Sequence, residues 1–199
     1  GYDICLEKPA AVNIEDCVLI RDTANKLGRK VMLTHVMRYA PFYQQIKQMI
    51  DNGILGEIVT LNQTENIAYW HFALSYVRGP WRKMADSSAT IIAKCCHDLD
   101  IINWLIPAKC TSVSSYGNLY YFNRTHAPEG SADYCVDCAP ETKEKCLYNA
   151  YNIYPQRMNT SVVGGTARLK GRDIYKILDN KEDVIGRCVF RGDNDAIDN

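Results

Sequence analysis

Apolar residues near the start of the chain fall into two short runs separated by a helical stripe. Residues 4–6 form the first run, which Pro9 closes because proline cannot donate to a strand ladder. Asn13 suits the N-cap of a helix that Gly28 ends, and residues 30–34 form the second run. This order of strand, helix and strand predicts a parallel α/β layer with buried strands.

Two further helices are expected from apolar residues at helical spacing. One begins at Pro41 and ends at Gly53. The other begins at Ser87 or Ser88 and ends before Pro107. Strand-like segments cover residues 57–64, 111–115, 119–122 and 185–191. Residues 65–87 are irregular and aromatic, and loops this long inside compact domains are usually functional.

Composition and charge exclude several classes of function. Of the 199 residues, 47% are hydrophobic, and 23 basic and 23 acidic residues give a formal net charge of zero. This balance argues against nucleic acid or an anionic membrane as a main partner. No apolar run approaches the roughly 20 residues that cross a bilayer. The start lacks the features of a secretory signal, so the nine cysteines are expected as reduced thiols in a cytoplasmic protein.

The tripeptide Glu7-Lys8-Pro9 follows the first predicted strand. Ligands of open parallel sheets sit outside the carboxyl ends of the strands, so a lysine there would point into the crevice. Burial near other cations lowers a lysine pKa towards neutrality, which suits proton transfer. The alternative, a surface lysine before a turn proline, is favoured by the tripeptide taken alone.

The helix at residues 88–105 carries Lys94 and His97 one turn apart on one side. His97 can exchange a proton near neutral pH. The alternative is a buried, hydrogen-bonded histidine, with Asp98 and Asp100 as solvated charges, and the helix alone favours it.

Together, in this order and separation, the two motifs resemble those of the Gfo/Idh/MocA family of NAD(P)-dependent oxidoreductases. In that family a Glu-Lys-Pro ends a late strand of the nucleotide-binding domain, and a His-Asp helix follows in the second domain. Further similar stretches are residues 36–39, 51–58, 77–82, 127–130 and 186–189. The resemblance covers about residues 1–154, and residues 155–182 have no recognisable counterpart.

The resemblance implies an α/β protein, α+β in its second part, cut at both ends. Residues 1–36 would be the C-terminal remnant of a Rossmann domain. Residues 37–199 would be a substrate-binding and oligomerisation domain with a mostly antiparallel sheet and flanking helices, through which homo-oligomers are expected. No Gly-x-Gly-x-x-Gly occurs in the sequence, so the chain alone is expected to bind NAD or NADP poorly.

The resemblance also assigns roles to individual residues. Lys8 would contact substrate and nicotinamide, and His97 would be the acid/base residue. Glu7, Pro9 and Arg82 would lie near the cofactor. Substrate contacts are implied for His71, Arg78, Trp81 and Lys94. Many members carry Asp and Gly at the positions of Ala93 and Cys95, so the usual carboxylate partner is missing here, and Lys94 could fill part of that role.

Three cysteines in one loop add a second candidate site. Cys135, Cys138 and Cys146 could hold Zn²⁺ with a fourth ligand. That ligand could be one of Cys110, His126, Cys95 and Cys96. Reduced thiols packed in a loop are the alternative, and an iron–sulfur cluster is a further one.

We therefore expect an oxidoreductase that transfers hydride between NAD(P) and a CH–OH group of a sugar, inositol or similar polyol. Two alternatives stay open at this stage. One is an NAD-dependent redox-cycling glycosidase, which would release a reducing sugar without net NADH. The other is a zinc-stabilised binding module in which Lys8 has no function. Substrate identity, the choice between NAD and NADP, and the reaction direction are not encoded in these residues.

Overall fold

The structure is a computed structural model that describes residues 1–157 and 171–198. It divides into two compact units. Unit 1 comprises Gly1–Asn66 and Ile91–Ser114, and unit 2 comprises Ile67–Thr90 and Ser115–Asn199. These units are clusters of contacts rather than family domains, so the boundary predicted after residue 36 stays a prediction.

Unit 1 begins with the predicted strand, helix and strand. These are β1 (Ile4–Leu6), α1 (Ile14–Lys26) and β2 (Val31–Leu33). The strands pair in parallel, with Leu6 opposite Leu33. The side chain of Asn13 accepts a hydrogen bond from the Asp16 amide and caps α1, and Gly28 adopts φ +62° just after the helix. The sequence prediction of this segment is confirmed.

The expected burial of these strands is wrong for this chain. Ile4 and Met32 are each 51% exposed, and Ala24 alone is buried in α1. Two strands and one helix provide too few neighbours to cover both faces of a sheet. Strand formation depends on local pattern and one partner, whereas burial depends on layers that these residues do not supply.

The rest of unit 1 is mainly helical. It contains η1 (Val36–Tyr39), α2 (Pro41–Asp51) and α5 (Cys96–Leu105), and α5 packs against η1 and α2. Pro41 occupies the first turn of α2, as predicted. The long helix predicted over residues 88–105 is interrupted. It consists of α4 (Thr90–Ala93) and α5, with a turn at Lys94 and Cys95 between them.

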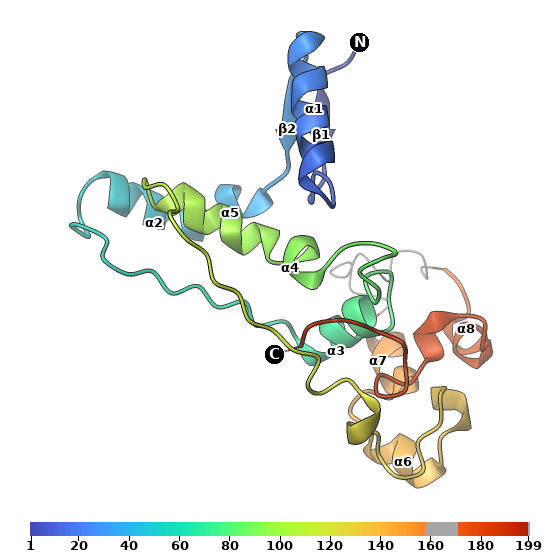
Figure 1. Cartoon of the computed structure of the whole chain (residues 1–199). Coiled ribbons are helices and arrows are strands. Elements are labelled where there is room, and N and C mark those ends of the chain that lie inside the picture. The colour runs from blue at the N-terminus through green and yellow to red at the C-terminus, as the bar shows by residue number, and fades with distance from the viewer. Residues whose placement is uncertain (158–170, 199) are drawn as a thin grey trace. The chain divides into compact units, whose positions relative to one another are not determined.

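The strand-like segments after β2 are not strands here. Residues 58–68 and 111–120 carry no regular element and run as extended chain (Figure 1). Val59 and Val113 are 90% and 82% exposed. Residues 185–191 contain a turn of 3-10 helix and one antiparallel bridge, between Tyr134 and Arg187. A strand needs a partner for its backbone groups, and within the described part of the chain these segments have none apart from that bridge. The predicted antiparallel sheet is not seen among the described residues.

Unit 2 consists of short helices. It contains α3 (Tyr69–Phe72), the π-helix η2 (Ala73–Val77), η3 (Arg124–His126), η4 (Cys135–Asp137), α6 (Pro140–Lys145), α7 (Ala150–Arg157), α8 (Ile174–Asp179) and η6 (Val184–Gly186). All five residues of η2 are buried, so part of the segment predicted to be irregular forms the interior. Among the described residues, no helix combines the length and apolarity needed to span a bilayer.

Two apolar clusters fill the interior of unit 2. The first includes Leu74, Tyr154 and Leu178 and joins η2, α7 and α8. The second includes Val77 and Phe122. Both clusters contain residues of η2, which explains why this helix is buried along its whole length.

Candidate functional site

Lys8 lies where the sequence predicts it, two residues after the end of β1. The peptide bond between Lys8 and Pro9 is cis. The Lys8 ammonium Nζ donates a hydrogen bond of 2.5 Å to the backbone carbonyl of Ala93, the last residue of α4. This contact joins the loop after β1 to the helix pair that carries His97.

The same contact accounts for the interruption between α4 and α5. In a continuous α-helix the Ala93 carbonyl would accept from the His97 amide four residues on. Here that carbonyl accepts from Lys8, and the His97 amide donates to the Lys94 carbonyl at 3.4 Å. The sequence did not predict this interruption because Lys8, the donor to the Ala93 carbonyl, lies 85 residues away along the chain.

His97 lies in a setting that favours the neutral imidazole. Its Nδ1 is buried and has no hydrogen-bond partner in the described part of the chain. Burial is the largest cause of a pKa below the ordinary value of 6.5, and the nearby charges of Lys8, His35 and Lys94 add to it. A neutral ring is ready to accept a proton.

The carboxylates around His97 are not the solvated charges of the alternative interpretation. Asp98 is buried; its Oδ1 accepts from Gln63 at 2.9 Å, while its buried Oδ2 lacks a partner among the residues described. Asp100 accepts two hydrogen bonds of 2.6 Å from Arg38. That bidentate geometry fixes the Asp100 carboxylate next to η1.

His35 is a member of the site that sequence reasoning missed. It lies two residues after the end of β2, and its Nε2 lies 3.8 Å from Asp100 Oδ1. Its ring centroid is 6.0 Å from that of His97, with the rings nearly perpendicular. The sequence carries one signal for His35: like Lys8, it follows the carboxyl end of a predicted parallel strand.

Lys94 faces a carboxylate rather than standing alone. Its Nζ lies 2.8 Å from Glu65 Oε1, and both side chains are about a quarter exposed. Lys8, Lys94 and His97 are therefore brought together within unit 1, and we call them, with His35 and Asp98, the Lys8–His97 site. Glu7 is exposed and Pro9 is half-buried beside Lys8.

The other predicted cofactor and substrate residues belong to unit 2. His71 in α3 stacks on Trp70, with ring centroids 5.7 Å apart. Trp81 is half-buried in the turn after η2, and Arg82 forms an ion pair of 3.2 Å with Asp193.

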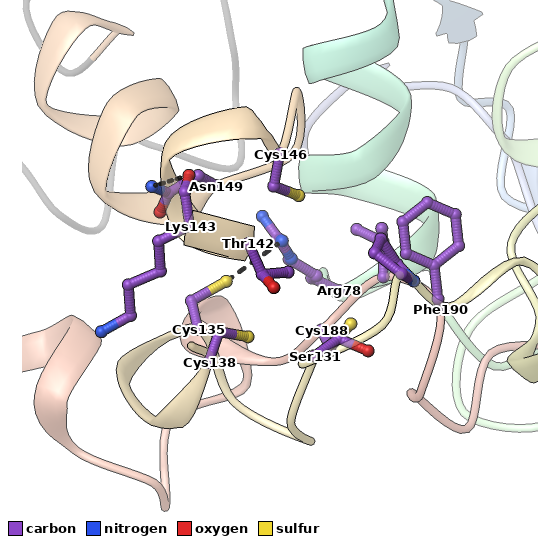
Figure 2. Close-up of a pocket in the computed structure, with 12 residues that line it drawn as sticks. Arg78, Ser131, Cys135, Cys138, Thr142, Lys143, Cys146, Asn149, Cys188 and Phe190 are labelled. Carbon is purple, nitrogen blue, oxygen red and sulfur yellow. Dashed lines mark hydrogen bonds between the residues drawn. The ribbon is translucent and has the colours of Figure 1, made fainter. Parts of the chain in front are cut away.

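Arg78, predicted as a substrate contact, is buried in unit 2 with 1% of its surface exposed. Its guanidinium donates to the carbonyls of Arg187 at 2.5 Å and Tyr148 at 2.6 Å. It also donates to the Tyr154 hydroxyl at 3.4 Å and the Cys135 sulfur at 3.6 Å. Figure 2 shows this guanidinium among the pocket-lining side chains. All three of its nitrogen atoms have protein acceptors, an arrangement that suits a structural role.

The predicted zinc site is not supported. Cys135, Cys138 and Cys146 do line one pocket with Cys188 (Figure 2). However, the residues described contain no group of three or more His, Cys, Asp or Glu side chains that could hold a metal ion. The Cys138 sulfur instead accepts from the Ala132 amide at 3.3 Å. Burial raises the pKa of Cys146 and of Cys188, which favours neutral thiols over the thiolates that bind metals.

Comparison with known proteins places this chain in a family. Residues 47–195 match the model of an oxidoreductase family, Gfo/Idh/MocA, described as its C-terminal alpha/beta domain. The chain is 29% identical over 150 residues to the putative oxidoreductase YteT of Bacillus subtilis, which is 73% of this chain and 34% of YteT. It is 36% identical over 106 residues to the inositol 2-dehydrogenase/D-chiro-inositol 3-dehydrogenase of Lactiplantibacillus plantarum, covering 50% of this chain and 26% of that protein.

A third relative carries a different activity in its name. The chain is 29% identical over 116 residues to the 2,7-anhydro-N-acetylneuraminate hydratase of Escherichia coli, covering 57% of this chain and 30% of that protein. The chain thus spans about a third or less of the length of these three relatives. No solved structure matches it. The family match covers most of the chain, and the chain belongs to the Gfo/Idh/MocA family of oxidoreductases.

Proposed function

We propose that the protein to which this chain belongs is an NAD(P)-dependent oxidoreductase acting on a CH–OH group of a sugar, inositol or similar polyol. One observation carries the proposal: the Lys8 ammonium is bound to the carbonyl of Ala93, next to the turn that presents His97. The family membership and the inositol dehydrogenases among the relatives support the same reaction class.

The roles follow from charge. Lys8 donates a hydrogen bond to the substrate oxygen and stabilises negative charge that develops there. His97, kept neutral by burial and by neighbouring cations, accepts the hydroxyl proton. A nicotinamide cofactor, when bound, accepts the hydride from the carbon that bears this hydroxyl group. In the neutral ring one of the two nitrogens carries a free lone pair, and this nitrogen can accept the proton.

The residues present fit only the reactive end of such a cofactor. Glu7, Lys8 and Pro9 follow β1, and His35 follows β2, so both sets lie at the carboxyl edge of a parallel sheet, where ligands of such sheets bind. The Gly-rich turn that would hold a pyrophosphate is not in these residues. We propose that residues 1–36 form part of a Rossmann domain whose other residues hold the nucleotide.

Residues 37–199 then form a substrate-binding and oligomerisation domain. We propose that the extended segments at residues 58–68 and 111–120 pair within a mostly antiparallel sheet of the whole protein. The exposed apolar side chains of Val59 and Val113 support this, because a strand face of that kind is normally covered. In this proposal Arg82 and Trp81 lie near the cofactor and His71 contacts substrate.

The test uses the whole protein and a Lys8→Met variant. Methionine keeps the length of the side chain and removes its charge and its donors, so we expect kcat to fall by about 10²- to 10⁴-fold. The measurement is formation of reduced nicotinamide with a panel of inositols and sugars. Lys26→Met is the matched control, because Lys26 is an exposed lysine of the same unit.

Two outcomes would count against the proposal. A Lys8→Met variant with activity within about threefold of the parent would remove Lys8 from the chemistry. Release of a reducing sugar without net formation of reduced nicotinamide would identify a redox-cycling glycosidase instead.

A further inference from the structure

His35 has two contacts and one unpaired nitrogen that the proposed function does not explain. Its Nε2 faces Asp100 Oδ1 at 3.8 Å, and its ring packs edge-to-face against His97. Its other nitrogen, Nδ1, is buried without a partner in the described part of the chain. Leaving a polar atom unpaired costs free energy, so packing alone does not account for a histidine at this position.

The charges around His97 come from several elements. Lys8 after β1, His35 before η1 and Lys94 after α4 each oppose a proton on His97, whereas Asp98 on its own helix favours one. Other ionisable groups nearby are already paired or neutral: Glu65 with Lys94, Arg38 with Asp100, and the thiols of Cys95 and Cys96, whose pKa values burial raises.

We propose that His35 is a positioning residue that orients the His97 ring and, when its own ring carries a proton, opposes a second proton on His97. This inference rests on the proposed function, in which His97 accepts the substrate proton. The Asp100 carboxylate that the His35 Nε2 faces is itself fixed by two hydrogen bonds from Arg38. A second proton on the adjacent His97 ring would then lie about 6 Å from the first, where like charges repel.

The test is an NMR titration of histidine ring protons in the whole protein, with the His97 signal assigned by its loss in His97→Gln. In His35→Gln we expect the His97 titration midpoint to rise by about half a pH unit, the shift that one charge at this distance produces. His35→Lys restores a cation and should bring the midpoint back down. A purely structural role for His35 would not produce a rise of the His97 midpoint in His35→Gln that His35→Lys reverses.

His126→Gln is the matched control, because His126 belongs to η3 in unit 2 and should leave the His97 midpoint unchanged. An unmoved His97 midpoint in His35→Gln would overturn the inference. If that variant does not fold, His35→Asn tests the same point, because it also removes the ring that can carry the opposing charge and should also raise the His97 midpoint. A His97 midpoint that stays unmoved in His35→Asn overturns the inference as well.

Activity separates this inference from the proposed function. The acid limb of the kcat/KM profile should move to higher pH in His35→Gln by the same amount as the NMR midpoint. A shifted midpoint in a protein without dehydrogenase activity would leave the charge coupling in place and remove the proposed function. Dehydrogenase activity with an unshifted midpoint would remove the role of His35 alone.

Discussion

At the scale of single residues, His97 differs from an ordinary exposed histidine in what surrounds its ring. Burial is the largest cause of its lowered pKa, and the nearby charges of Lys8, His35 and Lys94 add to the effect. The resemblance to the family predicts a carboxylate at the position of Ala93, and in this chain the backbone carbonyl of Ala93 accepts from Lys8. The site therefore disfavours a charged His97 without any carboxylate contacting its Nδ1 among the described residues.

The lowered pKa of His97 makes stability depend on pH. The folded state binds the proton less readily than the unfolded chain, whose histidine has the ordinary value of 6.5. As pH falls through that value, unfolded chains gain the proton first, so the free energy of unfolding decreases until the pH lies below the folded pKa. Because the folded pKa is the lower one, stability is greater above this window than below it.

Urea unfolding at about pH 7.5 and about pH 5.5 measures this effect. The parent should lose more stability between the two conditions than His97→Gln, in which the titrating group is absent. His126→Gln should behave like the parent. An equal loss in the parent and in His97→Gln would contradict the assignment of this pH dependence to His97.

Arg78 allows a prediction about a buried structural cation. Arg78→Met keeps much of the apolar stem but leaves the carbonyls of Arg187 and Tyr148 without their donor. We expect the free energy of unfolding to fall by about 2–5 kcal/mol, measured by urea denaturation. Arg124→Met, at an exposed arginine of the same unit, should change it by less than about 0.5 kcal/mol.

At the scale of elements, the interruption between α4 and α5 determines where the site residues point. A continuous helix would keep Lys94 and His97 on one side, one turn apart. The turn at Lys94 and Cys95 instead accompanies an ion pair from Lys94 to Glu65 and the placement of His97 beside His35. The hydrogen bond from Lys8 to Ala93 thus affects both the ion pair of Lys94 and the geometry of α5, which carries His97.

Gly79, two residues after the end of η2, is the second feature at this scale with a testable consequence. A Cβ at this position would lie 2.1 Å from the Leu74 carbonyl oxygen and 2.7 Å from that of Ser75. These are backbone atoms of a buried π-helix and cannot move aside without displacing it. Gly79→Ala should therefore destabilise unit 2 by about 1–3 kcal/mol or more.

Thermal unfolding followed by circular dichroism measures the effect of Gly79→Ala. Gly192→Ala is the control, since its Cβ would meet the nearest atom, the Cys188 carbonyl oxygen, at 3.4 Å, which is an ordinary contact. Equal midpoints for Gly79→Ala and the parent would show that η2 is not held as closely as the structure indicates.

The elements that could be predicted were those with local start and stop signals. The helices α1 and α2 are confirmed because Asn13, Pro41 and the glycines that follow act on their own neighbours in sequence. The π-helix η2 was not predicted because it has no such signal. Its formation depends on packing in the interior of unit 2. The strand-like segments at residues 57–64 and 111–115 remain unpaired because an apolar pattern provides no partner.

At the scale of the whole molecule, the Lys8–His97 site draws on residues from the loop after β1, the end of β2, the segment before α3 and the turn between α4 and α5. These segments meet within unit 1. The relatives are about three times as long as the matched region or longer, and the proposed cofactor-binding role depends on residues that the whole protein supplies.

The sequence by itself determined the family and the α/β character of the first segment, because these follow from motifs and from local capping signals. It also predicted roles for Lys8 and His97, which stay predictions. Only the tertiary structure decided that Lys8 binds the Ala93 carbonyl, that His35 joins the site, and that the cysteines of unit 2 pack around a buried arginine. Such contacts join residues far apart in the chain, and their strength depends on burial and on neighbouring charge. Neither quantity can be obtained from spacing along a sequence.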